Sequence, residues 1–345
     1  MPASSNTGAR RARIEDVAAA ANVSVATVSR ALRNLPNVAE STRQRVVEIA
    51  RELDYRPDPA AARLATGRSR TVTVVVPHLS SWYFSTVVAG AEAVCAETGY
   101  ECLVLGVNTI EQCTRLLDAS SHLERRTDGV VLVNIPARPE QAVSLRSRGI
   151  ALVTVGTQTP GFPAVLIDDV RAGGMAAAHL VGLGHRHIGL ISGQHDDPMN
   201  FAVPRLRRQG FADGLRAAGV ELREDAVESG NFGIDGGQEA MAALLEGPEP
   251  PTAVFAMSDE MAFGGLLEFS ERGLRAGIDI SLIGVDDHDV SRVLGLTTIR
   301  QRVSGQGAAA VRALVTLLAT GEVEVATIDS PLELVVRSTT GPPVV

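Results

Sequence analysis

The stretch at residues 23–32, VSVATVSRAL, brings three hydroxyl side chains and one guanidinium group into a segment that is otherwise small and apolar. The hydroxyls belong to Ser24, Thr27 and Ser29, and the guanidinium belongs to Arg30. Hydroxyl groups can hydrogen-bond phosphate oxygens, and an arginine can bond guanine O6 and N7 together in a bidentate fork. These residue types suit contact with DNA, provided that one element presents them on a common face.

Charge is unevenly spread along the chain, although its formal net charge is −8. Residues 1–70 carry 12 arginines against 7 acids, a balance of +5. The remaining 275 residues carry 20 arginines against 33 acids, a balance of −13, and the sequence contains no lysine. A basic N-terminal part on an acidic remainder indicates that the N-terminal part is the one that meets a polyanion.

Three short helices are expected to position these groups. Apolar residues at helical spacing predict the first helix: Ile14, Val17, Ala18 and Ala21. Ser24 can cap a second helix from about Val25 to Leu32, and a third helix is predicted from about Glu40 to Leu53. Two helices with a tight turn between them are typical of a helix-turn-helix domain. A small helical bundle without a role in nucleic-acid binding would show the same pattern.

The sequence IEDVAAAANVSVATVSRALRN, followed by VAESTRQRV and LDYRPDPAAARLATGRS, closely resembles the N-terminal part of LacI/GalR transcription regulators. The resemblance covers about 60 residues. It implies a flexible arm over 1–13, a helix-turn-helix domain over 14–56 and a hinge helix or linker over 57–70. The second helix of such a motif lies in the major groove of DNA.

The resemblance also implies which residues contact DNA. Val25 and Ala26 occupy the two main base-reading positions, Arg30 follows one turn later, and Asn37 matches a further contact. The expected DNA-binding residues are Ser24, Val25, Ala26, Thr27, Ser29, Arg30, Asn37, Thr42 and Leu64. Val28 and Leu32 are expected to face the core of the domain.

Leu64 lies in the hinge, where a matching family leucine wedges between base steps in the minor groove. In the family this hinge helix forms only on the operator. The sequence departs from the family at Asp58, where asparagine is usual, and at Arg63, because the usual arginine stands one position earlier. Asp58 places a negative charge near phosphate.

From Val72 onward, short apolar strands alternate with helices, which predicts a parallel, doubly wound sheet. The pattern restarts at AVLIDD, so a second lobe is expected. The predicted fold is an all-α helix-turn-helix head plus a two-lobed, doubly wound α/β body similar to periplasmic sugar-binding proteins. The body should span 71–345, with a first lobe over about 71–166 and 300–322 and a second over about 167–299 and 323–340. The chain should cross between lobes near 165–168, 297–301 and 322–326, and a helix over 303–320 should return to the first lobe.

Ligands of open parallel sheets bind beyond the carboxyl ends of the strands. Tyr83 and Phe84 follow the first strand directly after Trp82, and three adjacent aromatic side chains cannot all face a core. Arg207 can grip two adjacent oxygens, and Asp286 can accept hydrogen bonds from vicinal hydroxyls. The effector-binding residues implied by the resemblance are Ser80, Tyr83, Phe84, Arg207, Ser258, Asp259 and Asp286.

Two of the strand ends depart from the family pattern. Ser258 stands where the family usually has asparagine, and so does Asp169. One of the two carboxylates Asp168 and Asp169 is expected only to cap the helix that follows.

Enzymatic and metal-binding interpretations are disfavoured. The segment GLGHRHIG (182–189) lies between a predicted helix and a strand, so it is not a dinucleotide-binding loop. His185 and His187 alternate on a strand entry and must point in opposite directions, and the adjacent carboxylates Asp286 and Asp287 should diverge. The spacing of the three cysteines fits neither a disulfide framework nor a zinc site, so they are expected to be core thiols: Cys95, Cys102 and Cys113. We expect no cofactor.

The sequence therefore predicts a sequence-specific DNA-binding regulator, most simply a repressor, that binds a palindromic operator as a homodimer and responds to a small molecule. A sugar or sugar derivative is the favoured effector, and a purine stacking on Tyr83 and Phe84 is the alternative. A transport binding protein would share the body without the head, and a DNA-binding protein without ligand control would share the head without a pocket. The segment MPASSNTGARRAR lacks a signal-like apolar run, and no run approaches the roughly 20 residues of a membrane span, so a cytoplasmic protein is expected. The end STTGPPVV carries no heptads, which favours a dimer.

Overall fold

The structure of the protein is a computed structural model that describes residues 12–55, 68–193, 201–321 and 327–344. The chain divides into two compact units, Met1–Ser69 and Arg70–Val345. Each unit has an apolar core of its own. The predicted hinge contacts of Asp58, Arg63 and Leu64 lie outside the described residues.

The first unit consists of three helices, α1 (Ile14–Ala21), α2 (Val25–Leu32) and α3 (Glu40–Glu52). Their common core is built from small residues: Val17, Ala18, Ala21, Val28, Ala31, Val46 and Ala50. The chain turns between α1 and α2 through Asn22, whose φ of 53° is left-handed. Ser24 caps α2, because its Oγ accepts a hydrogen bond from the backbone N–H of Thr27 at 3.1 Å. The predicted helix-turn-helix is confirmed.

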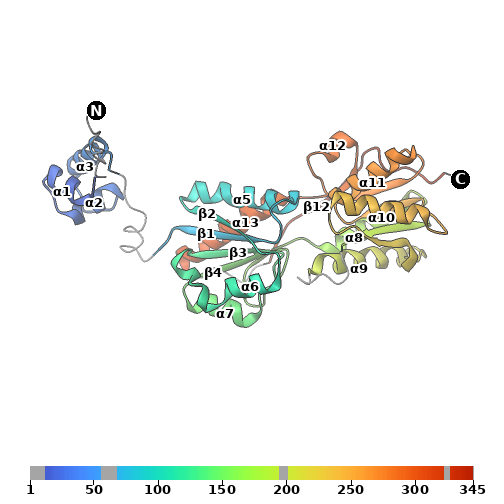
Figure 1. Ribbon diagram of the computed structural model, residues 1–345, viewed down its shortest axis with the longest axis horizontal. Coiled ribbons are helices and arrows are strands. Elements are labelled where there is room, and N and C mark those ends of the chain that lie inside the picture. Colours follow the sequence, from blue (N-terminus) through green and yellow to red (C-terminus); the bar gives the residue numbers. More distant parts are fainter. Residues whose placement is uncertain (1–11, 56–67, 194–200, 322–326, 345) are drawn as a thin grey trace, which may run out of the picture. The chain divides into compact units, whose positions relative to one another are not determined.

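The first lobe of the second unit is a parallel sheet in the order β11-β5-β4-β3-β1-β2. Its strands are β1 (Thr71–Val76), β2 (Glu101–Gly106), β3 (Gly129–Val133), β4 (Ala151–Val155), β5 (Ala164–Leu166) and β11 (Thr327–Asp329). Helices α5 (Trp82–Thr98) and α13 (Val303–Thr320) cover one face, and α6 (Ile110–Leu117) and α7 (Pro139–Ser147) cover the other (Figure 1). Val74 faces the first pair and Val75 the second, because successive strand residues point to opposite faces. Two short 3₁₀ turns, Ala119–Ser121 and Leu123–Arg125, follow α6.

The second lobe repeats this design with the strand order β12-β10-β9-β8-β6-β7. Its strands are β6 (Ile188–Ser192), β7 (Val227–Ser229), β8 (Ala253–Ala256), β9 (Ser281–Asp286), β10 (Thr297–Gln301) and β12 (Leu332–Val335), of which β12 runs antiparallel to β10. Its helices are α8 (Asp169–Gly182), α9 (Ala202–Ala217), α10 (Ile234–Glu246), α11 (Asp259–Arg272) and the short α12 (Ser291–Leu294), with a 3₁₀ turn at Glu224–Ala226. Figure 1 shows α8 and α9 on one side of this sheet and α10 and α11 on the other. The predicted two-lobed, doubly wound fold is confirmed.

The chain passes between the lobes at three places, two of which differ from expectation. The first crossing follows β5, within the expected range 165–168. The second was expected near 297–301 but lies after β10, between Gln301 and α13. The third was expected near 322–326 but lies at Ser330–Pro331, because β11 still pairs with β5 in the first sheet. Gln301 belongs to the second sheet, so the first lobe resumes at α13 rather than at residue 300.

Glycine allows α8 and α9 to pack unusually close together. A methyl group on Gly210 would come within 1.8 Å of the carbonyl oxygen of Val170, and one on Gly173 within 2.1 Å of the carbonyl oxygen of Arg207. Only hydrogen fits at either position, so the two backbones touch there. This contact brings Arg207 on α9 next to Asp169, the first residue of α8.

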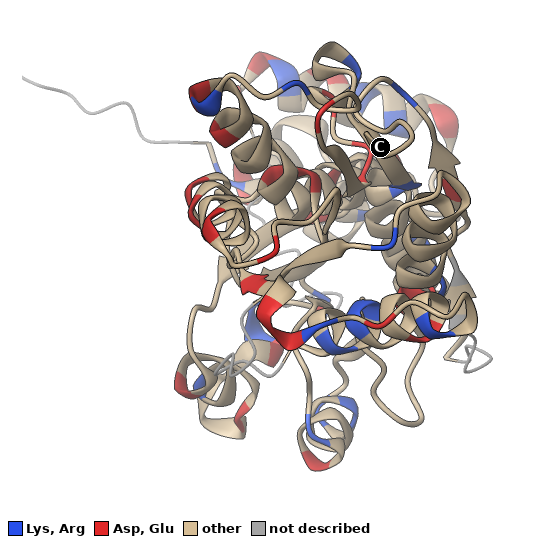
Figure 2. Ribbon diagram, turned by 90° about the vertical axis from the view of Figure 1, so that its right-hand side faces the viewer, with Lys and Arg blue, Asp and Glu red and all other residues tan. Residues whose placement is uncertain are grey.

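The apolar segments of the larger unit serve its cores. By length and composition α13 could cross a membrane, yet its own residues Val311 and Leu314 are fully buried against the first sheet. Cys95 and Cys113 are buried and Cys102 is half-buried, and all three are free thiols. Figure 2 shows charged residues mainly on helices and connecting loops.

Candidate functional site

One face of α2 is left uncovered by the helical core. Val28 and Ala31 are buried, whereas Val25, Ala26 and Arg30 are exposed. The side chain of Val25 is available for contact, because the residue keeps 40% of its surface exposed. Positions 26 and 30 are four residues apart and lie on the same side of the helix, and position 25 precedes them at the helix start, so these side chains can approach a base edge together.

Hydroxyl groups frame the start of the same face. The Oγ atoms of Ser24 and Thr27 lie 2.8 Å apart and share a hydrogen bond, and Ser29 is half-buried one turn later. Thr42 is half-buried near the start of α3. Because the capping bond fixes the side chain of Ser24, its remaining hydrogen-bonding capacity points outward at a fixed place.

Arg43, which the sequence analysis did not single out, connects α3 to the loop after α2. Its Nη1 donates to the carbonyl of Ala31 at 3.1 Å, and its Nη2 donates to the carbonyl of Leu35 at 2.9 Å. The second bond holds the loop that carries Asn37, which is exposed and has a left-handed φ of 66°. The sequence signal that could have identified Arg43 was its position in the first turn of the third helix.

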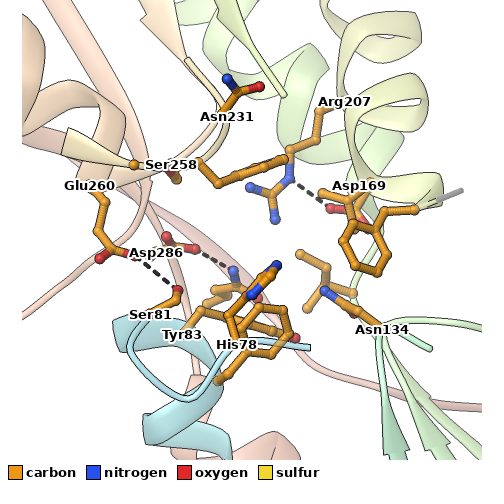
Figure 3. A pocket seen from close by; sticks show the side chains of 18 of the residues that line it. His78, Ser81, Tyr83, Asn134, Asp169, Arg207, Asn231, Ser258, Glu260 and Asp286 are labelled. Atoms are coloured by element: carbon orange, nitrogen blue, oxygen red, sulfur yellow. Dashed lines mark hydrogen bonds and ion pairs between the residues drawn. The ribbon is translucent and has the colours of Figure 1, made fainter. Parts of the chain in front are cut away.

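The second candidate site is a cavity of about 450 Å³ between the two lobes. It lies at the carboxyl ends of strands from both sheets, which is where open α/β sheets bind ligands. Six of the seven predicted effector residues line it: Ser80, Tyr83, Phe84, Arg207, Ser258 and Asp286. Figure 3 shows Ser81, Tyr83 and His78 on one side, facing Arg207 and Asp169 on the other. The structure therefore brings these six residues together around one cavity, and their role in binding an effector stays a prediction.

A buried ion pair lies in this cavity. The Nε of Arg207 donates to Oδ1 of Asp169 at 2.8 Å, and each side chain is only 5% exposed. Nη1 of Arg207 also donates to the carbonyl of Met257. Burial raises the pKa of Asp169 above its usual value, and the neighbouring guanidinium offsets part of that rise. The adjacent Asp168 is the capping carboxylate, since its Oδ1 accepts from the backbone N–H of Arg171 at 2.8 Å.

A directed chain of hydrogen bonds runs from the first lobe into the second. The hydroxyl of Tyr83 donates to Oε1 of Gln306 at 3.1 Å, and Nε2 of Gln306 donates to Oε1 of Gln301 at 2.8 Å. Nε2 of Gln301 then donates to Oδ1 of Asp286 at 2.5 Å. Burial raises the pKa of Asp286 to about 8, although Arg207 lowers it in part. The chain joins α5 and α13 of the first lobe to β9 and β10 of the second.

Asp286 and Asp287 diverge, as predicted. Asp286 has a φ of 130°, a strained conformation for a residue with a side chain, and faces the cavity. Asp287 instead accepts from Nε of Arg300 at 2.6 Å and from Nη2 of Arg337 at 2.5 Å. These two carboxylates therefore do not form a catalytic pair.

Asp259 does not lie where the sequence analysis expected it. It is absent from the described lining of the cavity and is fully buried behind Ser258. Its Oδ1 accepts from Thr298, and its Oδ2 accepts from Ser291 and from the backbone N–H of His288. Burial raises its pKa to about 6 despite these hydrogen bonds. Because the side chain turns toward β10, Asp259 stabilises the second lobe rather than offering oxygens to a ligand.

Two contacts link the lobes at the edge of the cavity. Oγ of Ser81 donates to Oε2 of Glu260 at 3.0 Å (Figure 3). The ring of Trp82 stacks against His288, with ring centroids 4.6 Å apart, and His288 also meets the edge of Phe263. Both contacts start from the beginning of α5. The three consecutive aromatic side chains therefore do not all face the core, as expected: Trp82 contacts the second lobe, whereas Tyr83 and Phe84 line the cavity.

Aromatic rings form the apolar walls of the cavity. Phe84 is 9% exposed and contacts both Tyr83 and His78. Phe232 has a left-handed φ of 55°, and its ring covers the bare Cα of Gly193, where a methyl group would come within 2.2 Å. A bulky residue rarely adopts this conformation, so its position is held by the surrounding packing.

Sequence reasoning missed several lining residues: His78, Ser81, Asn134, Phe201, Asn231, Phe232, Glu260, Gln301 and Gln306. Asn134, Asn231 and Gln301 end or follow strands of the two parallel sheets, so strand-end position was a usable signal for them. Phe201 and Phe232 belong to a chain with few aromatics, which was a second signal.

The buried histidine His185 forms hydrogen bonds within the second lobe. His185 is 1% exposed, and its ring nitrogens bond Thr252 and both Ser281 and the Gly341 carbonyl at 2.8–3.0 Å. Within the part of the chain that the structure describes, no three His, Cys, Asp or Glu residues are grouped to hold a metal ion.

Similarity to known proteins extends over both units. Residues 13–58 match the family model of bacterial regulatory proteins of the lacI family, and residues 177–340 match that of the periplasmic binding protein-like domain. Catabolite control protein A of Priestia megaterium is 31% identical, over 95% of this chain and 98% of that protein. Among solved structures, the lac repressor dimer bound to operator and the anti-inducer ONPF superposes with a TM-score of 0.83 at 27% identity, over 96% of this chain and 100% of the other. A complex of the transcriptional regulator CelR with cellobiose gives a TM-score of 0.69 at 28% identity, over 95% and 100%. The chain therefore belongs to the LacI family of DNA-binding transcriptional regulators.

Proposed function

We propose that the protein is a transcriptional repressor that binds a palindromic operator as a homodimer and is controlled by a sugar-like molecule bound between the lobes of its second unit. One observation carries this proposal. A single chain combines a helix-turn-helix unit, whose open face presents Val25, Ala26 and Arg30, with a lobed unit that has a polar and aromatic cleft. A transport protein would not need the first unit, and a purely architectural DNA-binding protein would not need the second.

Each unit has a defined part in the proposed mechanism. The α2 face reads bases, with Ser24, Thr27, Ser29, Asn37 and Thr42 fixing its register on the phosphates. Two heads in a two-fold dimer read a palindrome, and Leu64 takes the minor-groove position that the family resemblance gives it.

The effector acts by changing how the lobes meet. The Tyr83–Gln306–Gln301–Asp286 chain and the Ser81–Glu260 contact both join the lobes next to the cavity. A ligand that binds one arrangement of the lobes better than the other shifts the repressor toward that arrangement. The cellobiose complex of CelR supports a sugar-like effector for this chain. In this role the protein is a regulator rather than an enzyme, and it works in the cytoplasm, where the chromosome lies.

The test is a selection of genomic fragments by the purified full chain at near-physiological salt. We expect enrichment of a palindrome, and the same protein with Arg30→Ala should lose that enrichment while keeping salt-sensitive binding to bulk DNA. Enrichment of nothing beyond such non-specific binding, with and without small molecules from the medium, would contradict the proposal.

A further inference from the structure

Two of the three cysteines meet where α5 lies beside β2 in the first lobe (Figure 1). Cys95 is near the C-terminal end of α5, and Cys102 is the second residue of β2. Cys95 belongs to the apolar core between the first sheet and the helices α5 and α13, and Cys102 packs against that core. A hydrogen bond joins the two thiol groups. The two cysteines are therefore direct neighbours inside one packed cluster.

The backbone between the two cysteines determines how they face each other. After α5 the chain turns at Gly99, whose φ of 72° is left-handed, and the N–H of Tyr100 donates to the carbonyl oxygen of Cys95 at 2.8 Å. β2 starts at the next residue, and Cys102 pairs in register with Val72 of β1. Since successive strand residues point to opposite faces, Cys102 points to the face of the sheet that α5 covers.

The two thiols differ in their access to solvent and in their acidity. Cys95 is 1% exposed, whereas Cys102 is half-buried, because β2 is an edge strand. The hydrogen bond with Cys95 lowers the pKa of the Cys102 thiol below its ordinary value of 9.0, although burial and Glu92 raise it in part. The same hydrogen bond raises the pKa of Cys95, and so does burial. Because the thiolate is the nucleophilic form, Cys102 is the thiol that meets an oxidant first.

Cys113 offers a comparison within the same lobe. It lies on α6, is 6% exposed and belongs to the core on the other face of the sheet. Burial raises the pKa of its thiol, although Arg138 lowers it in part. Among the described residues of that core it is the only cysteine. A buried thiol with a raised pKa is chemically inert, so Cys113 should not react as the pair does.

We propose that Cys95 and Cys102 form a redox-active dithiol, which a hydroperoxide converts to an intramolecular disulfide by reaction first at Cys102. The Cys102 thiolate bonds to one peroxide oxygen as the O–O bond breaks, and the departing oxygen takes up a proton and leaves as water or an alcohol. The sulfur of Cys95 then displaces the hydroxyl group of the Cys102 sulfenic acid, and that group leaves as water with the thiol proton. Two thiols are oxidised to one disulfide, and one peroxide is reduced. A small dithiol reverses the reaction by thiol–disulfide exchange.

The dithiol is separate from the two sites described above. Neither cysteine belongs to the helix-turn-helix unit or to the described lining of the cleft. Its reaction therefore does not depend on the binding of operator or effector. The disulfide would join the C-terminal end of α5 to β2, whereas Ser81 and Trp82, at the opposite end of α5, contact the second lobe.

Peptide mapping of the full chain tests the proposal, because cleavage after glutamate separates the three cysteines. Cys95 falls in peptide 93–97, Cys102 in 102–111 and Cys113 in 112–124. The reduced wild-type protein is treated with hydrogen peroxide, its remaining thiols are alkylated, and the digest is analysed by mass spectrometry. We expect peptides 93–97 and 102–111 to be joined with the loss of two hydrogen atoms, and peptide 112–124 to be alkylated. Dithiothreitol should restore the separate peptides.

Three other outcomes of this mapping would overturn the proposal. The first is that all three peptides stay alkylated at a peroxide concentration that oxidises a free cysteine. The second is a disulfide that joins two chains or includes Cys113. The third is conversion of Cys102 to a sulfinic acid with no link to Cys95.

Single variants assign the order of the two steps. Cys95→Ser should stop at a sulfenic acid on Cys102, which dimedone traps. Cys102→Ser should consume peroxide at least about tenfold more slowly than wild type, because only buried thiols remain. Cys113→Ser is the matched control and should react at the wild-type rate. Circular dichroism confirms that each variant folds, and the map of the wild-type protein stands where one does not.

The pH dependence of the wild-type rate checks the nucleophile. The rate should rise with pH as Cys102 ionises, with a midpoint below 9.0, the ordinary thiol value. Glu92→Gln should move this midpoint further down, since the Glu92 carboxylate raises the pKa of Cys102. A Cys102→Ser protein that reacts as fast as wild type would show that Cys102 is not the nucleophile.

Discussion

The guanidinium of Arg207 and the carboxylate of Asp169 form a hydrogen-bonded ion pair with an Nε–Oδ1 distance of 2.8 Å inside the cleft of the second unit. The two residues come from α9 and α8, which touch through Gly210 and Gly173. The pair therefore couples the packing of two helices to the electrostatics of the ligand site.

Removing one member of this pair should be costly. Arg207→Ala leaves Asp169 buried without its cation, so we expect a loss of about 3–5 kcal/mol in the free energy of unfolding. The double variant Asp169→Leu/Arg207→Met should regain most of that stability, because neither charge remains, and still fail to respond to effector. Urea unfolding and operator release measure the two properties. A double variant that responds normally would rule out the pair as part of the ligand site.

Close packing of α8 and α9 can be tested at Gly210. Gly210→Ala forces a methyl group against the backbone of Val170 and should lower the free energy of unfolding by about 1–3 kcal/mol. Gly182→Ala is the control, because no atom lies within 4 Å of the added methyl, and its stability should be unchanged or up to about 1 kcal/mol higher. Equal stabilities of the two variants would show that the helices are not in the contact described.

Asp286 makes stability depend on pH in a defined direction. Its ordinary pKa is 3.8, and burial raises it to about 8 in the folded chain, so folding favours the protonated form. The protonated carboxyl group therefore contributes to the free energy of unfolding. This contribution is fully present below about pH 4 and is lost as the pH rises to about 8. Asp286→Asn mimics the protonated group, so the variant should gain stability relative to wild type between pH 4 and 8. Denaturant titrations at pH 5 and 8.5 measure this difference, and parallel curves for the two proteins would contradict the raised pKa.

Because Trp82 of the first lobe stacks on His288 of the second, the fluorescence of Trp82 reports on the contact between the lobes. Trp82 is the only tryptophan, and protonated imidazole quenches indole fluorescence. Burial lowers the pKa of His288 below its ordinary value of 6.5, although Glu260 and Asp289 raise it in part, and Asp259 accepts from its backbone N–H. Fluorescence should therefore fall as the pH is lowered, with a midpoint below 6.5.

His288→Ala should remove this titration, and effector should change the intensity in wild type by shifting the lobes. A titration of unchanged amplitude in His288→Ala would mean that another group quenches Trp82.

Base reading by α2 can be measured separately from these effects. Arg30→Ala should weaken specific operator binding by at least about 1 kcal/mol and relax base choice at one position, because a bidentate arginine contributes about 1–3 kcal/mol of discrimination. Arg51→Ala, an exposed arginine near the end of α3, is the control for loss of charge. Competition assays with operator and random DNA distinguish the two variants. An equal fall in specific and non-specific affinity would show that Arg30 contacts only phosphate.

The sequence alone determined the features that depend on neighbouring residues. Ser24 caps α2 because its hydroxyl meets an amide three residues later, and the order of strands and helices follows from apolar runs of limited length. Val28, which was expected in the head core, is buried there, and Tyr83, which the family resemblance assigned to the ligand site, lines the cavity. The specific family resemblance of the first 60 or so residues gave the candidate DNA-binding face.

Only the tertiary structure decided which strand-end groups share the cleft. Asp259 and Glu260 are adjacent in sequence, yet one turns into the second lobe and the other reaches Ser81 across the cavity. The third crossing moved to Ser330–Pro331 because β11 pairs with β5, a contact between residues far apart in the chain. Local sequence patterns do not predict which distant segments pair. The direction of a side chain at a strand end depends on the packing of the neighbouring lobe, which exists only once the chain has folded.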